Sequence, residues 1–292
     1  MSGKRSEGRV PVAKTYKIYI GGKFPRTESG RFYPLKDEDG NVLANVSHGS
    51  RKDFREAVVA ARAAFAGWSG ASAYLRGQIL YRIAEMLEGR RAQFVSELQL
   101  QGSKAKKAER EVDAAIDRLI YFAGWADKYQ QVFSAVNPVS SSHFNFSVLE
   151  PTGVVAILAP ENSGLLGLVS NIAPAIVGGN TCVALASESK PLCAISFAEV
   201  LESSDVPPGV VNLITGFRPE LTEHFASHMD VNAIVYCEDS GDGGAQIQTL
   251  AAGNIKRVVG RTGTDWTDAT SDTPYLINDT QETKTTWHPI GR

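Results

Sequence analysis

Short apolar runs alternate with amphipathic stretches through the second half of the chain. Each run has the length of a strand that is buried on both faces, and the stretches between the runs have helical length and spacing. A strand that alternates with a helix in this way predicts an α/β fold, in which a parallel sheet carries helices on both faces. The apolar runs are 153–159, 181–185, 210–214, 231–237 and 255–259, and the helical stretches are 165–177, 190–201, 219–227 and 243–252.

Helical periodicity dominates the first half of the chain. Apolar residues recur at steps of three and four in 51–68, 74–96 and 105–129, which predicts an N-terminal helical segment. Before it, residues 16–23 predict a strand that turns on two glycines. The aromatic residues fall mostly on the apolar stripes, so we expect them in the core: Trp68, Tyr121, Phe122 and Trp125. The charges of the third helix predict a solvated face: Glu109, Arg110, Glu111, Asp113, Asp117 and Arg118.

Three further segments lack a helical period. Residues 132–148 alternate as exposed strands do, which predicts a small antiparallel hairpin whose edge invites pairing with another chain. Residues 281–292 have the character of a short strand, and residues 261–280, rich in Thr, Asp and Gly, predict a loop. Residues 1–15 are polar and basic, which predicts a flexible leader or linker.

Composition excludes several classes of protein. The chain of 292 residues is 43% hydrophobic, with a net charge of −2, so we expect no nucleic-acid partner. We also expect no membrane partner, because no apolar run is long enough to cross a bilayer. The cysteines show neither metal spacing nor a disulfide framework, which predicts a cytoplasmic location. His224 and His228 lie one helical turn apart, but without a third ligand nearby we favour surface or capping histidines and predict no metal site.

Several separate blocks resemble the cofactor domain of the aldehyde dehydrogenase superfamily. They occur in the order that the family shows: Glu150-Pro-Thr-Gly-Val-Val, Ala159-Pro-Glu-Asn162, Ala173-Pro-Ala-Ile-Val-Gly-Gly-Asn-Thr, Pro207-Pro-Gly-Val-Val-Asn and Ala226-Ser-His-Met-Asp. The resemblance covers roughly residues 16–260 and a short tail at the C-terminus. It implies a Rossmann-like sheet and, further along the chain, an arm used for oligomerisation.

This resemblance divides the chain into parts. It implies a cofactor-type, NAD-binding-like domain in 16–131 and 151–260, and an oligomerisation arm in 132–150 and 281–292. Residues 261–280 are then a loop that stands in place of the family's catalytic domain. Two further motifs, Tyr16-Lys-Ile-Tyr-Ile-Gly-Gly-Lys-Phe-Pro-Arg and Gly124-Trp-Ala-Asp-Lys-Tyr, are similar to the truncated, non-catalytic C-terminal module of the two-module aldehyde dehydrogenase 16 family.

The family's chemistry needs an oxyanion donor, a cofactor, a nucleophilic thiolate and a carboxylate base. Asn162 occupies the position of the oxyanion donor, but the neighbouring aromatic residue of the family motif is replaced by Glu161, whose charge would oppose an oxyanion. We therefore expect Asn162 to be vestigial and to hold the turn between strand and helix. The base position falls on Arg261, so the general base is absent.

The cofactor positions are also altered. In the ribose clamp that the family motif implies, Glu188 is retained and Leu185 replaces the lysine, so we expect Glu188 to be a vestigial cofactor-binding residue. Where the resemblance implies that the pyrophosphate lies, the chain has three acids, which would repel a dianion. Acids are favourable at the start of a helix, and we expect that role for Glu238, Asp239 and Asp242. None of the cysteines lies in a matching context for a nucleophile: Cys182, Cys193 and Cys237.

We therefore predict a pseudoenzyme, an aldehyde-dehydrogenase-like module without catalytic activity that acts in oligomerisation or protein association. Its partner would be a second copy of the chain or another aldehyde-dehydrogenase-like module, and no cofactor is expected. Two alternatives remain open. One is a regulatory module that senses NAD, if the pocket is still competent. The other is an NAD(P)-dependent aldehyde oxidoreductase with an unusual site.

Overall fold

The computed structural model describes residue 12 and residues 14–238 and 243–291. At its centre lies a sheet of five parallel strands in the order β10-β9-β6-β7-β8, which confirms the predicted parallel sheet. The chain runs outward from β6 to β8 and then returns to place β9 and β10 on the other side of β6. A topological switch point therefore lies between β6 and β9. The strands are β6 (Val154–Leu158), β7 (Thr181–Leu185), β8 (Val211–Ile214), β9 (Ala233–Glu238) and β10 (Arg257–Thr262).

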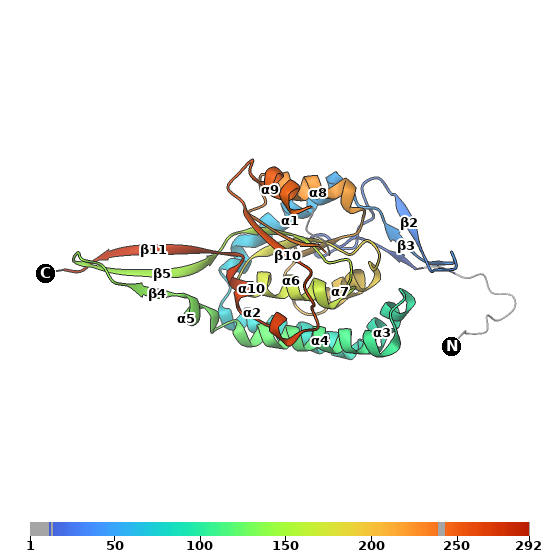
Figure 1. The fold of residues 1–292 in the computed structure, drawn as a ribbon, viewed down its shortest axis with the longest axis horizontal. Coiled ribbons are helices and arrows are strands. Elements are labelled where there is room, and N and C mark those ends of the chain that lie inside the picture. The colour runs from blue at the N-terminus through green and yellow to red at the C-terminus, as the bar shows by residue number, and fades with distance from the viewer. Residues whose placement is uncertain (1–11, 13, 239–242, 292) are drawn as a thin grey trace.

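Helices cover both faces of this sheet, as predicted (Figure 1). Alternate residues of β6 point to opposite sides, so that Val154, Ala156 and Leu158 join one core cluster while Val155 and Ile157 join the other. One face is covered by α1 (Arg51–Ser69), α8 (Arg218–Ser227) and α9 (Gly244–Ala251), and the other by α6 (Leu166–Val177) and α7 (Leu192–Glu202).

A further layer of helices packs on the outside of α6 and α7. It contains α2 (Ala73–Gly89), α3 (Arg91–Leu100) and α4 (Ala105–Trp125), and the short α5 (Tyr129–Phe133) follows at the base of the arm, against strand β5 (His143–Pro151) (Figure 1). The single helix predicted over 74–96 is wrong: the chain breaks at Arg90 (φ −110°), directly after Gly89, and restarts there because the carbonyl of Arg90 accepts from Gln93 N at 2.9 Å. The aromatic prediction is confirmed for Trp68 and Phe122, which are fully enclosed, while Tyr121 and Trp125 are half-buried against the same core.

A small second sheet was missed by the sequence analysis. It consists of β1 (Thr15–Tyr16), β2 (Phe32–Lys36) and β3 (Val42–Ser47), in the order β1-β3-β2. The strand predicted over 16–23 is reduced to β1 and two isolated bridges at Tyr19 and Ile20. The turn that follows is confirmed, since Gly21 (φ 58°) and Gly22 (φ 75°) both adopt left-handed conformations between Ile20 and Lys23.

An antiparallel arm projects from the α/β body (Figure 1). Its sheet has the order β11-β5-β4, and β11 pairs with β5 along its whole length, from Gln281 opposite Pro151 to Pro289 opposite His143. The predicted hairpin and the predicted terminal strand are thus confirmed, and they pair with each other. The strands are β4 (Ala135–Asn137), β5 (His143–Pro151) and β11 (Gln281–Pro289).

Residues 263–280, which we call the strap, connect β10 directly to β11. The prediction of a structureless loop from 261 is wrong in two respects, because β10 continues to Thr262 and the strap contains a 3-10 turn (Ala269–Ser271) and the short helix α10 (Tyr275–Asn278). Trp266 and Ile277 anchor the strap in the core. Among the described residues, none of the helices has the length and apolar character that a membrane crossing needs.

Candidate functional site

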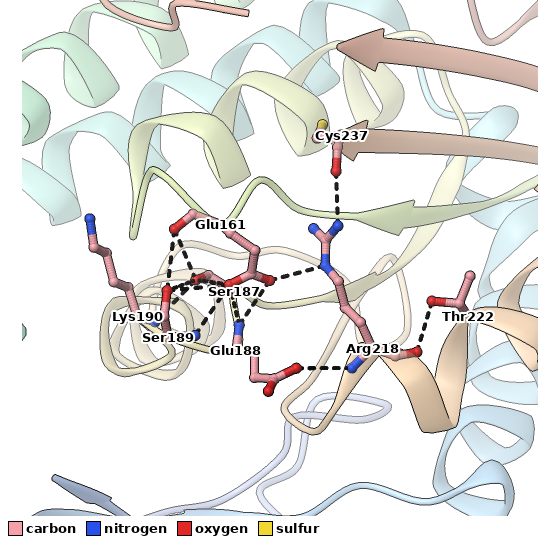
Figure 2. A network of polar contacts seen from close by, with 8 residues as sticks. All are labelled: Glu161, Ser187, Glu188, Ser189, Lys190, Arg218, Thr222 and Cys237. Carbon is pink, nitrogen blue, oxygen red and sulfur yellow. Dashed lines mark hydrogen bonds and ion pairs between the residues drawn. The ribbon is translucent and has the colours of Figure 1, made fainter. Parts of the chain in front are cut away.

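The loops at the carboxyl ends of β6 and β7 meet beside the switch point, which is where open α/β sheets bind their ligands. The first of these loops carries Glu161 and Asn162, and the second carries Ser187, Glu188 and Ser189. Arg218 reaches the same place from the start of α8 (Figure 2).

The carboxylate of Glu161 lies in a ring of hydrogen-bond donors (Figure 2). It accepts from Glu188 N at 2.9 Å, from Ser187 Oγ at 2.9 Å and from Ser189 N at 3.2 Å, and Arg218 Nε lies 3.0 Å from its other oxygen. We call these four donors the anion cradle. Charge-assisted hydrogen bonds of this kind are the strong ones, so Glu161 ties the loop after β6 to the loop after β7 and to α8.

Arg218 and Glu188 are held by further contacts. Arg218 Nη1 donates to the carbonyl of Cys237 at 2.9 Å, which links α8 to the end of β9. The carboxylate of Glu188 accepts from Arg218 N at 3.2 Å and therefore occupies an amide at the start of α8. Both side chains are thus engaged within the chain.

Several buried donors at the cradle make no hydrogen bond within the described part of the chain. They are Arg218 Nη2, the hydroxyl of Tyr33 and Arg218 Nε, whose contact with Glu161 is an ion pair. Burial raises the pKa of Tyr33, and the negative charges of Glu188 and Glu161 raise it further, so the hydroxyl stays protonated and remains a donor. Buried donors are normally satisfied, so unsatisfied donors at one site need an explanation.

Asn162 lies at the mouth of a separate pocket of about 490 Å³, which Glu111, Ser163, Leu166 and Trp266 also line. The side chain of Asn162 is exposed, and its backbone carbonyl accepts from Lys190 Nζ at 3.3 Å. The turn that we expected Asn162 to hold is fixed by its neighbour, since Ser163 Oγ accepts from Gly167 N at 2.8 Å. A serine ahead of an apolar helical run is a capping signal that the sequence offered.

Glu111 completes that turn, and the prediction that it belongs to a solvated face is wrong. Its carboxylate is buried and accepts from Ser163 Oγ at 2.7 Å, Leu165 N at 3.0 Å and Leu166 N at 3.4 Å. A negative charge is favourable at the N-terminus of a helix, here α6. The pocket at Asn162 therefore has an acid at its base where an oxyanion site would need donors.

Arg118 is the second exception on α4. It is buried, donates to Ser170 Oγ at 2.5 Å and to the carbonyl of Trp266 at 3.1 Å, and forms an ion pair with Asp272. Burial lowers the pKa of Arg118, and Asp272 opposes that shift. The remaining charges of the predicted face are exposed, as expected: Glu109, Arg110, Asp113 and Asp117.

Arg261 occupies the position where the resemblance places a general base. Its guanidinium is buried, with Nη1 at 2.5 Å from Asn171 Oδ1 and Nη2 at 3.2 Å from Asp279 Oδ2. A guanidinium offers N–H donors and no acceptor, so it cannot take the part of a carboxylate base. It connects β10 to α6 and to the end of the strap.

The three cysteines of the chain all lie among the described residues, and all are buried. Burial raises the pKa of the Cys182 and Cys193 thiols. Cys193 also lies 3.9 Å from the carbonyl of Phe94, inside the packing of α7. Because the thiolate is the nucleophile, such thiols are inert.

The clamp that the resemblance implies for an adenosine ribose does not fit these residues. Leu185 is fully buried in β7, and the amide of Glu188 is taken by Glu161. Glu238 is the last residue of β9, so its prediction as an acid at a helix start is wrong, whereas Asp239 and Asp242, the other acids predicted there, lie outside the described residues. Within the described ranges, no group of three or more acids, histidines and cysteines is arranged to hold a metal ion.

The sheet order, the switch point and the motifs around it define the class of protein. The chain belongs to the aldehyde dehydrogenase family, whose model matches residues 25–265. Among individual relatives, it is 31% identical over 265 residues to omega-crystallin of Enteroctopus dofleini, covering 88% of this chain and 52% of that protein. It is 33% identical over 251 residues to retinal dehydrogenase 2 of Mus musculus, covering 84% of this chain and 48% of that one.

Solved structures agree with this assignment. The NAD+ complex of aldehyde dehydrogenase from Bacillus cereus matches with a TM-score of 0.80 at 27% identity, covering 85% of this chain and 51% of that one. HpcC from Thermus thermophilus matches with a TM-score of 0.80 at 29% identity, covering 85% of this chain and 48% of that one. The chain thus spans about half the length of the relatives that it matches.

Proposed function

We propose that this chain is a catalytically inactive aldehyde-dehydrogenase-like module, a pseudoenzyme that acts through protein association. The single observation that carries the proposal is the burial of all three cysteines, because acyl transfer by the family's route starts from an accessible thiolate. The arginine at position 261 supports it, since it replaces a base by a cation. A place in the two-module aldehyde dehydrogenase 16 family and a cytoplasmic location belong to the same proposal.

The strap is consistent with inactivity. It runs from the end of β10 to the arm in residues 263–280, where the resemblance implies a catalytic domain in the relatives. Its indole at Trp266 and its carboxylates at Asp272 and Asp279 are committed to contacts with the body.

Catalysis is tested by incubating the purified chain with NAD+ and an aldehyde and following NADH absorbance, with human aldehyde dehydrogenase 1A1 as a positive control. We expect no NADH above the protein-free reaction. Turnover that persists after repeated purification contradicts the proposal and favours the alternative of an oxidoreductase with an unusual site.

The arm supplies the surface for association. Val136, Phe144, Phe146 and Val148 share one face of its sheet, around a shallow pocket of about 330 Å³. Val136 is 67% exposed and Phe144 is 45% exposed. The outer edge of β11 has no pairing strand among the described residues, so it can add a strand from a second copy of the chain or from a related module.

Association is tested by light scattering on the chain and two arm variants. Phe144→Lys places a charge on the apolar face and is expected to lower the mass of the assembly. Thr283→Lys adds the same charge opposite Leu149, on the other face, and serves as the matched control. Equal masses for all three proteins would remove the arm from the proposal.

A regulatory module that senses NAD is the second candidate. The observation that favours it is the pair of unsatisfied donors, Arg218 Nη2 and the Tyr33 hydroxyl, next to the retained Glu188. Calorimetry with NAD+ at millimolar concentration decides between the two, because saturable binding without turnover supports a sensor.

A further inference from the structure

The anion cradle is built from two elements of the fold, and Glu161 enters it from a third. The amides of Glu188 and Ser189 and the hydroxyl of Ser187 come from the loop after β7, and the guanidinium of Arg218 comes from α8 (Figure 2). Backbone amides that converge with an arginine side chain make a site for oxygen anions, as in the concave amide groups that bind phosphates. Here the oxygen anion is a side-chain carboxylate of the chain itself.

The charges around the cradle favour an anion in it. Glu188 turns its carboxylate to the amide of Arg218 and so uses a different donor. Lys190 Nζ donates to the carbonyl of Asn162, on the loop that carries Glu161. If the carboxylate of Glu161 were absent, two amides, a hydroxyl and a guanidinium would lose their shared acceptor. Of their residues Ser187 is buried, and buried donors require an acceptor.

The cradle also has more donors than a carboxylate uses. Arg218 Nη2 and the Tyr33 hydroxyl are buried and unsatisfied within the described residues. The pKa of Tyr33 is raised in part by the negative charges of Glu188 and Glu161, so its ring lies within their electrostatic reach. A carboxylate offers two oxygens, whereas a phosphate group offers three or four, and the unused donors correspond to that difference.

We propose that the anion cradle is a phosphate-binding site which Glu161 occupies as an internal ligand, so that the chain accepts a phosphate group only when this carboxylate is removed or displaced. The ligand class is inorganic phosphate or the phosphate monoester of a nucleotide. An internal ligand competes at the high effective concentration of an intramolecular contact, which excludes external anions at ordinary concentrations. The proposal deepens the function proposed above and rests on it, since it gives the reason why a cofactor would no longer bind.

Calorimetric titrations with inorganic phosphate, AMP and NAD+ test this on the full chain, Glu161→Ala and Glu161→Ala/Arg218→Ala. We expect no saturable binding to the unmodified chain at millimolar phosphate. The Glu161→Ala variant is expected to bind roughly tenfold tighter or better, and the double variant is expected to lose that gain. Tighter binding of AMP than of phosphate indicates that the ligand is a nucleotide. Equal affinities indicate that the ligand is free phosphate.

The control is Glu56→Ala, which removes one exposed negative charge from α1, outside the cradle. It is expected to behave as the unmodified chain does. If Glu161→Ala does not fold, Glu161→Gln gives the same test, because it keeps the size of the side chain and removes its charge, and a rise of melting temperature with phosphate reports binding.

The inference is overturned if neither Glu161 variant binds phosphate, or if the unmodified chain binds it as tightly as they do. Both outcomes are independent of aldehyde turnover and of the mass of the assembly. Failure of this inference is therefore distinguishable from failure of the proposed function.

Discussion

At the scale of single residues, His228 has a neutral ring built into the junction of α1 and α8. Its edge packs on Phe54 with ring centroids 5.6 Å apart, and Nδ1 accepts from Asp230 N at 3.2 Å. Burial lowers the pKa of His228, Lys256 and Arg55 lower it further, and Asp230 opposes them. Protonation of Nδ1 would remove the acceptor that Asp230 N uses.

This gives a prediction for pH dependence. Because the pKa of His228 is lower in the folded state, the unfolded chain takes up the proton first as the pH falls through about 6.5, and the folded state loses stability there. We expect His228→Gln to flatten the dependence of unfolding free energy on pH between about 5 and 7. Urea unfolding at several pH values measures it. His288→Gln, on the exposed arm, controls for the substitution itself, and an unchanged slope for His228→Gln would contradict the prediction.

The residue scale also shows where sequence reasoning succeeded and failed. Leu185 and Arg261 could be recognised in the sequence as replacements within a family motif. The structure shows that both side chains are buried. The burial of Glu111 and Arg118 was missed because charges suggest a solvated face. They are seven positions apart on α4 and belong to the buried stripe of Ala108, Val112, Ala115, Leu119 and Phe122. Their helical spacing therefore indicated that they are buried.

At the scale of elements, the strap is fastened by two buried arginines from the body. Arg118 holds its first half through the carbonyl of Trp266 and the ion pair with Asp272, and Arg261 holds its end through Asp279. Next to that end, Asn180 Nδ2 donates to the carbonyl of Thr280 at 3.0 Å. The strap is therefore integral to the body although little of it is helix or strand.

We predict that Arg118→Ala destabilises the chain by about 3 kcal/mol, because it removes the partner of a buried polar network and an ion pair. Denaturant unfolding measures the loss, and limited proteolysis is expected to cut first within the strap. Arg110→Ala, exposed on the same helix, is the matched control and should change stability by less than about 0.5 kcal/mol. If Arg118→Ala loses as little stability as the control, the contacts of Arg118 do not hold the strap on the body.

Elements with one strong periodicity were predictable, and those defined by tertiary contacts were not. The strands β6 to β10 are apolar runs of the right length and were found, with β10 extended by three residues. The strands β2 and β3 were missed because charged and exposed positions, such as Lys36 and Val42, hide their alternation. The break at Arg90 is accompanied by a backbone bond to Gln93 and by a side-chain bond to Glu199, and the second is a tertiary contact that no local pattern shows.

At the scale of the whole molecule, the arm is poorly covered by the rest of the chain. Every residue of β11 after Gln281 is exposed, and exposed aromatic residues lie on β5 and β11, at Phe144 and Trp287. Exposed apolar surface of this kind favours association, and association stabilises the folded chain by mass action.

We therefore predict that the melting temperature rises with protein concentration. Calorimetric scans over a hundredfold range of concentration measure this. Phe144→Lys is expected to remove the dependence, while Thr283→Lys retains it. A melting temperature independent of concentration in the unmodified chain would show that the arm does not associate in the folded state.

The whole-molecule features were predictable only in part. Alternating strands and helices predicted a parallel sheet, and the resemblance added its Rossmann-like character. The pairing of β11 with β5 followed from the resemblance, which assigns 132–150 and 281–292 to one arm. Its register could not be predicted, because Ser147 and Thr285, which share a hydrogen bond at 2.8 Å, are 138 residues apart and nothing local relates them.

That separation has a consequence for how the chain is made. During synthesis β5 leaves the ribosome long before β11, and every strand of the central sheet is complete in the interval. The closing strand of the arm can therefore be added only to a body that already exists, and forming such distant contacts is slow. Until then one edge of β5 is unpaired, so under the association proposed above two copies would first meet while each is still being translated.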